Sequence, residues 1–189
     1  MTRITKEPEV RKQEILDAAM ELFYQNGYDK TSITDIAERI GIAQGLCYRY
    51  FKSKEELFDT ALDYYAQQQV NQMQSILCDT SKTLRQKLYE TPTFMDIEQN
   101  NRVYYKVCHG TNSKKIHDQL SMKICHKLVP ILKEQIQREV DLGELHFTDS
   151  ETAASFCIYG QLGILLRDDL SGEERLNRIR TFLLQLFEL

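Results

Sequence analysis

The sequence contains no tryptophan, only three prolines and eight glycines. No run reaches the roughly 18 apolar residues that a transmembrane helix needs, and residues 1–16 lack the apolar stretch of a signal peptide. Alternating apolar and polar residues, the pattern of a half-buried strand, are also scarce. These absences favour an all-α cytoplasmic protein that has no membrane partner.

The five cysteines are widely spaced and include no Cys-x-x-Cys pair, which fits reduced thiols in a reducing compartment. Two Cys-His neighbours, at 108–109 and 125–126, leave a metal-sensing alternative open because thiolate and imidazole suit zinc or copper. Adjacent helical residues point about 100° apart, however, so one pair is poorly arranged to chelate one ion. We expect no metal and no cofactor.

Motifs of catalysis are missing as well. The chain has no G-x-S-x-G, no Walker loop, no G-x-G-x-x-G and no HExxH, so we expect no enzyme. The net charge is −4. Residues 1–54 hold nine Lys and Arg against eight Asp and Glu, so any surface for nucleic acid must be local.

Apolar spacing of three and four predicts about nine helices. The segment "RKQEILDAAMELFYQNG" is expected to stop at Gly27, and short helices should follow near 32–40 and 43–51. Four further helix starts are predicted from Ser53-x-x-Glu56, Thr91-Pro92, Thr148-x-x-Glu151 and Ser171-x-x-Glu174. Later helices are expected at 114–141 with a bend near Pro130, at 149–167 and at 172–187.

Two domains follow from this pattern. Residues 1–52 predict a three-helix unit in which a glycine-containing turn joins two short helices, the helix-turn-helix arrangement. Residues 53–189 predict a helical body, to which the family resemblance given below assigns ligand binding and dimerisation.

The helix expected at 43–51 carries the chemistry of DNA recognition on its outer side. Gln44 can bond the N6 and N7 edge of adenine, and Arg49 can pair with guanine or phosphate. Tyr48 offers a hydroxyl to a phosphate. Lys52 and Lys54 flank a new helix N-terminus, which also favours anions.

Residues 15–57 resemble the N-terminal domain of TetR/AcrR-type transcriptional repressors. The matching elements are Ile15-Leu16, Ala18-Ala19, Leu22-Phe23, Gly27-Tyr28, Thr31-Ser32, Asp35-Ile36-Ala37, Gly41-Ile42, Gly45, Tyr48, Tyr50-Phe51 and Ser53-Lys54-Glu55-x-Leu57. The resemblance implies a homodimer that binds a pseudo-palindromic double-stranded DNA operator through two recognition helices. It also implies dimerisation through the last two helices and release of DNA by a small-molecule effector.

Together, the resemblance and the chemistry of residues 43–54 assign DNA binding to Thr31, Ser32, Thr34, Ala43, Gln44, Gly45, Leu46, Tyr48, Arg49, Lys52 and Lys54. Leu46 and Cys47 replace a common Thr-Leu, and Ala43 replaces a frequent Ser. Leu46 can touch a thymine methyl but cannot donate to a phosphate. These departures leave the operator sequence open.

The body supplies candidates of two kinds. Ligand-binding candidates, mostly aromatic, are Tyr64, Phe94, Tyr104, Tyr105, His109, Phe156 and Tyr159. Dimerisation candidates on the last two helices are Phe156, Gly160, Gly163, Leu176, Ile179 and Leu183. No cluster of positive charge marks an acidic ligand, so a hydrophobic effector is favoured.

Two alternatives remain on the sequence alone. The chain could be an α-helical small-molecule binding protein that no longer reads DNA, given the lost polar contacts at Ala43, Leu46 and Cys47. It could also be an activator on the same fold, which only the promoter outcome separates from a repressor.

Overall fold

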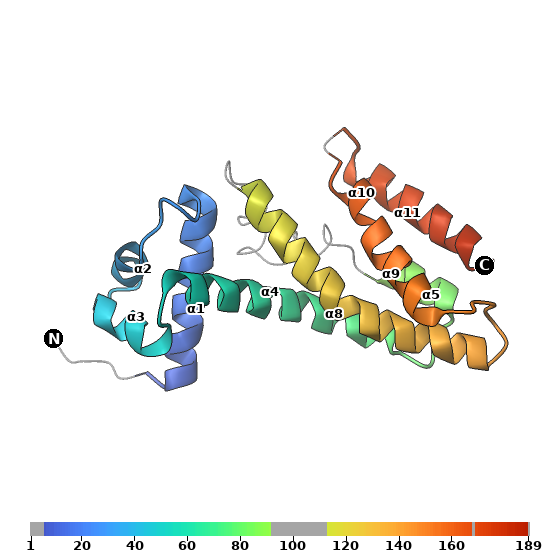
Figure 1. Cartoon of the computed structure of the whole chain (residues 1–189), viewed down its shortest axis with the longest axis horizontal. Helices are drawn as coiled ribbons and strands as arrows, with labels where there is room; N and C mark the ends of the chain where they lie inside the picture. Colours follow the sequence, from blue (N-terminus) through green and yellow to red (C-terminus); the bar gives the residue numbers. More distant parts are fainter. Residues whose placement is uncertain (1–5, 92–112, 168, 189) are drawn as a thin grey trace. The chain divides into compact units, whose positions relative to one another are not determined.

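The computed structural model describes residues 6–91, 113–167 and 169–188, and within these ranges the chain is helical without a strand (Figure 1). The helices are α1 (Pro8–Asn26), α2 (Ile33–Arg39), α3 (Gln44–Tyr50), α4 (Lys54–Leu77), α5 (Leu84–Glu90), α8 (Ser113–Asp141), α9 (Ser150–Gly160), α10 (Leu162–Leu165) and α11 (Gly172–Leu186). The chain divides into two compact units. We call described residues 6–65 and 113–120 the head, and described residues 66–91, 121–167 and 169–188 the body. The all-α prediction is confirmed.

Helix α1 is the support of the head. Its apolar face, which includes Ile15, Ala19 and Phe23, is fully buried. The helix ends at Gly27, as expected from the Asn-Gly pair, because Gly27 adopts φ 87° and donates its N–H to the Phe23 carbonyl.

Helices α2 and α3 form the short pair joined by a glycine turn. Ser32 begins α2: its side chain accepts from the Asp35 N–H, and the Asp35 carboxylate accepts from the Ser32 N–H, so aspartate completes this capping box. Gly41 has φ +68°, a left-handed conformation that favours glycine. Helix α3 ends at Phe51, which is buried.

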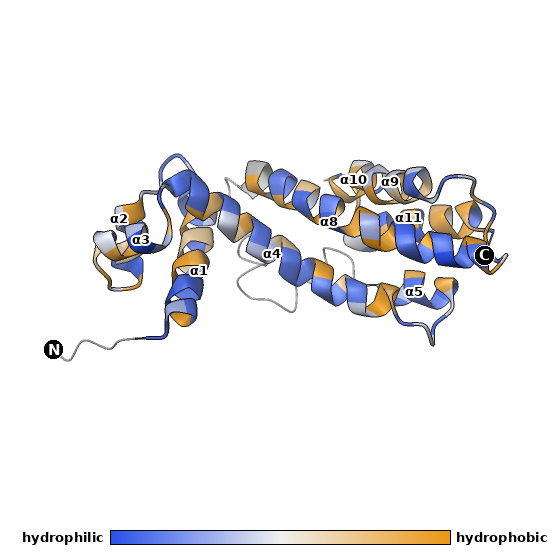
Figure 2. Ribbon diagram, turned by 60° about the horizontal axis from the view of Figure 1, so that its bottom comes forward, coloured by the Kyte–Doolittle hydropathy of each residue, from blue (hydrophilic) through white to orange (hydrophobic). Residues whose placement is uncertain are grey.

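The first turns of α4 belong to the head. Leu57, Ala61 and Leu62 are buried there, and the Tyr65 hydroxyl donates to Asp17 of α1 at 2.8 Å. The compact unit therefore reaches Tyr65, beyond the end at residue 52 that the sequence predicted for the three-helix domain. In Figure 2, α4 alternates hydrophobic and hydrophilic patches along its length.

The body packs α5, α9, α10 and α11 with the C-terminal turns of α8 around an apolar core. Ile136, Ala154 and Cys157 are among its most buried side chains. Helix α8 continues through Pro130 as one helix. The sequence analysis missed α5, which begins with a complete Thr83–Gln86 capping box.

Two predictions for the last helices were wrong in detail. Asp149, not Thr148, begins α9, because its carboxylate accepts from the N–H groups of Glu151 and Thr152. The helix expected at 149–167 is interrupted at Gln161, which separates α9 from α10. The Ser171–Glu174 box is confirmed. The start expected at Thr91-Pro92 lies outside the described residues.

Among the described helices, none is both long enough and apolar enough to cross a membrane.

Candidate DNA interface and ligand cavity

Helix α3 has a buried side and an open side. Cys47 and the following Phe51 are 1% and 2% exposed and fix the helix in the head. The opposite side presents Gln44, Tyr48 and Arg49 to solvent, with Tyr48 49% exposed. A seven-residue helix is too short to be stable alone, so this packing is what holds the open side in place.

The leading end of α3 is made of small residues. Ala43 and Gly45 are exposed, and Leu46 is half-buried. A Cβ added at Gly45 would meet no atom within 4 Å, so internal packing does not require glycine there. Glycine lowers helix stability relative to alanine, and the open space is suited to close approach of another molecule.

The α2 candidates divide in the same way. Ser32 and Thr34 are exposed, while Thr31 is 1% exposed. The Thr31 hydroxyl lies 3.1 Å from the Leu22 carbonyl and 2.9 Å from the Gly27 carbonyl, so it is used inside the head. The Thr31 N–H also donates to the Tyr28 carbonyl at 3.3 Å, so the polar groups of Thr31 are bonded within the head.

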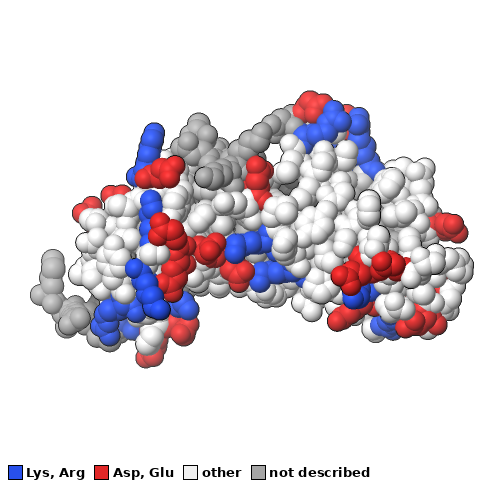
Figure 3. All heavy atoms as spheres, viewed as in Figure 1, with Lys and Arg blue, Asp and Glu red and all other residues white. Residues whose placement is uncertain are grey.

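The charges of the head are mixed in sign. Figure 3 shows Lys and Arg interspersed with Asp and Glu over α1 to α3. Arg39 pairs with Glu21 at 2.7 Å. Within the described residues, Arg49 and Lys52 form no ion pair, so both are available for phosphate.

Lys54 lies differently from Lys52. Its ammonium donates to the Tyr28 carbonyl at 3.0 Å and to the Thr31 carbonyl at 3.1 Å. It also lies 4.2 Å from the centroid of the Tyr28 ring. These contacts join the first turn of α4 to the turn between α1 and α2.

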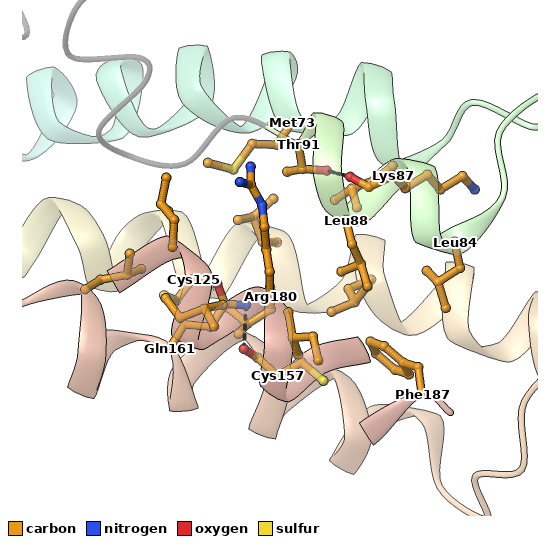
Figure 4. A pocket seen from close by; sticks show the side chains of 18 residues that line it. Met73, Leu84, Lys87, Leu88, Thr91, Cys125, Cys157, Gln161, Arg180 and Phe187 are labelled. Carbon is orange, nitrogen blue, oxygen red and sulfur yellow. Dashed lines mark hydrogen bonds between the residues drawn. The ribbon is translucent and has the colours of Figure 1, made fainter. Parts of the chain in front are cut away.

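The body contains a cavity of about 110 Å³ (Figure 4). Its lining comes from α4, α5, α8, α9, α10 and α11 and is largely leucine, isoleucine and methionine. Burial raises the pKa of the lining thiols Cys125 and Cys157 to about 11, so both are neutral at physiological pH and act as apolar groups.

A few polar groups border this cavity. Gln161 donates to the Cys157 carbonyl at 2.7 Å, and Arg180 donates to the Tyr89 carbonyl at 3.0 Å. Figure 4 shows the ammonium of Lys87 pointing away from the other lining side chains. No acidic residue lines the cavity within the described part of the chain.

The ligand-binding candidates are not brought together around this cavity. Tyr64 lies in the head, edge-on to Tyr65. The Tyr159 hydroxyl is hydrogen-bonded to His126 Nδ1 at 2.6 Å, and Phe156 is 76% exposed. Phe94, Tyr104, Tyr105 and His109 lie outside the described residues. These assignments stay predictions.

A second hollow, an apolar groove of about 680 Å³, runs along α9 and α11. Phe156 and Phe182 line it and are 76% and 61% exposed. Four of the dimerisation candidates also line it, namely Phe156, Gly160, Ile179 and Leu183. Leu176 lines the cavity instead, and Gly163 is exposed outside both hollows.

Comparison with known proteins agrees with this geometry. The model of bacterial regulatory proteins of the tetR family matches residues 15–61, which include α2 and α3. The regulator TtgR of Pseudomonas putida is 30% identical over 169 residues, which cover 82% of this chain and 78% of TtgR. The chain belongs to the TetR family. Members of this family are bacterial regulatory proteins.

Two solved structures have a similar fold. The regulator FadR of fatty acid degradation from Bacillus halodurans has TM-score 0.68 at 19% identity, over 96% of this chain and 97% of FadR. GusR of Salmonella enterica has TM-score 0.68 at 19% identity, over 97% of this chain and 98% of GusR. Three Bacillus subtilis regulators match over 66, 51 and 52 residues, and the chain spans 23%, 18% and 27% of their lengths.

Sequence analysis of this TetR-family chain missed most of the cavity. Leu84, Leu88 and Lys87 of α5 all line it, but α5 itself was not predicted. The Thr83-x-x-Gln86 pattern was the available signal for that helix. The cavity has no comparable signal, because its walls come from helices far apart in the sequence.

Proposed function

We propose that the chain is a homodimeric repressor that binds a pseudo-palindromic operator through α3 and is released by a small hydrophobic effector. The observation that carries this proposal is the two-sided exposure of α3. Cys47 and Phe51 fix one side, while Gln44, Tyr48 and Arg49 face outward around a glycine that packing does not require. A helix presented in this way suits the floor of a major groove.

The α9–α11 groove supports the homodimer. Phe156 of α9 and Phe182 of α11 expose large aromatic surfaces in this groove, and Gly160 leaves open space there. Exposed apolar surface of this kind is typical of an interaction site. A two-fold interface would bring the same patch of two copies together and give two recognition helices per molecule.

The 110 Å³ cavity supports a small effector. An apolar cavity of about 150 Å³ in another protein holds benzene. The cavity here therefore suits a ligand of only a few non-hydrogen atoms. The lining supplies one guanidinium, that of Arg180, and two neutral thiols. This chemistry supports the hydrophobic effector predicted from the sequence.

One observation that favoured the alternative, a small-molecule binding protein that no longer reads DNA, no longer supports it. Cys47 is 1% exposed, so it is a core residue and does not mark a lost DNA contact. Ala43 and Leu46 remain compatible with contacts to a groove floor.

Two substitutions on α3 test the proposal on a duplex selected from a random pool. Tyr48→Phe should weaken binding about tenfold for every sequence, since a hydroxyl bond to a charged phosphate is lost. Gln44→Ala should relax the preference at one base pair per half-site by about 1–3 kcal/mol. Titrations of matched and single-mismatch duplexes measure both effects. An unchanged preference in Gln44→Ala would remove Gln44 from base reading.

A further inference from the structure

The turn between α1 and α2 is held by the first turn of α4. Two carbonyls of this turn, those of Tyr28 and Thr31, accept hydrogen bonds from the Lys54 ammonium at 3.0 and 3.1 Å. An ammonium has three N–H donors, so two of the three are used in these contacts. Hydrogen bonds from a charged donor are the stronger kind, especially when they are partly buried as here.

The half-buried side chain of Tyr28 packs against the same helix. Its ring centroid lies 4.8 Å from that of Phe58 and 5.4 Å from that of Phe23. The Lys54 ammonium covers the ring at 4.2 Å, a cation–π distance. Burial raises the pKa of the Tyr28 hydroxyl, and its hydrogen bond to Glu55 adds to the shift. Lys54, Glu55 and Phe58 together therefore fix Tyr28.

The turn in question leads directly into the DNA-facing part of the head. Thr31, whose carbonyl accepts a hydrogen bond from the Lys54 ammonium, is followed by the cap Ser32 and by α2. Helix α2 in turn packs on α3, and a shift of the turn would move both helices.

We propose that Lys54 is a positioning residue, which orients the α1–α2 turn and α2 for DNA recognition and does not itself pair with a phosphate. This inference rests on the proposed DNA-binding function. It departs from the sequence-based assignment of Lys54 to the DNA contacts. Lys52, which is exposed and forms no ion pair within the described part of the chain, keeps the role of phosphate anchor.

The first test needs no DNA. Lys54→Met keeps most of the length of the side chain and removes its charge and donors. Amide hydrogen exchange of the free protein should become at least about tenfold faster at residues 28–32, because two charge-assisted bonds are lost. Lys52→Met is the control and should leave exchange there unchanged. Unchanged exchange in Lys54→Met would overturn the proposal whether or not the chain binds DNA.

The second test measures the affinity of each variant for the selected duplex as a function of salt concentration. A phosphate contact by Lys54 would occur twice in a dimer, and its loss would lower the salt slope by about 1.8. We expect Lys54→Met to weaken binding about tenfold with the slope unchanged. Lys52→Met should lower the slope by about 1.8.

Each remaining outcome is decisive. A lower slope in Lys54→Met would show a phosphate contact and overturn the positioning role. Faster exchange with full operator affinity would show that the contacts hold the turn without serving recognition, which also overturns it. Both Lys54→Gln and Lys54→Met are measured at a temperature at which thermal unfolding shows that each variant is folded. This comparison separates the results above from a failure to fold. If wild-type protein binds no duplex, the proposed function fails, while the exchange test still reports on the contacts.

Discussion

The head and the body use their apolar and polar groups in opposite ways. In the head, short helices are fixed by specific polar contacts, such as Thr31 with two carbonyls and Lys54 with two more, and the outer face of α3 is polar. In the body, the cavity and the α9–α11 groove are apolar hollows. Under the proposed function, recognition of DNA would depend on residue identity at fixed positions, whereas binding of an effector or a second copy would depend on shape and volume.

The largest effect should come from a charge in the α9–α11 groove. Phe156→Asp places a carboxylate on the exposed apolar surface and should prevent the dimer. Because two linked half-sites strengthen binding by about 100-fold or more, operator affinity should fall by that amount. Sedimentation and duplex titration measure both quantities.

Leu142→Asp is the matched control, since Leu142 is 64% exposed but lies outside the groove. It should stay dimeric with full affinity. A dimeric Phe156→Asp protein would mean that the groove is not the interface and would break the contrast between polar head and apolar body.

Filling the cavity should distinguish it from the neighbouring core. Leu128 lines the cavity and is 4% exposed, whereas Ile136 is 1% exposed and does not line it. Leu128→Phe should change the free energy of unfolding by less than about 1 kcal/mol, while Ile136→Phe should lower it by about 1–3 kcal/mol through overpacking. Urea denaturation measures the difference.

Xenon uptake gives the second readout of the same pair. Apolar cavities bind xenon, and Leu128→Phe should abolish uptake that the wild type and Ile136→Phe retain. Equal destabilisation by the two substitutions, with uptake retained in both, would contradict a cavity at Leu128.

The smallest effect concerns Gly45. Alanine meets no atom there and lowers the entropy of the unfolded chain, so Gly45→Ala should stabilise the free protein by about 0.5 kcal/mol. The added methyl should nevertheless weaken operator binding, by about tenfold or 1.4 kcal/mol, where α3 approaches the groove floor. Thermal unfolding and duplex titration measure the opposite signs. Stronger binding by the more stable variant would argue against close approach at this position.

The sequence predicted the head well because local signals define it. Gly27 and Gly41 end helices through positive φ, and Ser32 begins α2 through its own side chain. The structural role of Lys54 was not predictable, because its carbonyl partners are 23 and 26 residues away. In the body, the last two helices were recognised from their apolar faces, but the break at Gln161 and the helix α5 were missed. The cavity depends on which side chains fill a space between several helices, and spacing along one helix does not contain that information.

The central claim is that two copies of the head read DNA together. Selection of bound sequences from a random duplex pool, followed by a salt titration of the enriched duplex, tests it most directly. We expect a palindromic motif whose half-sites are about one helical turn apart, with affinity that falls steeply as salt rises. A single unpaired half-site, or a pool without enrichment, would contradict it.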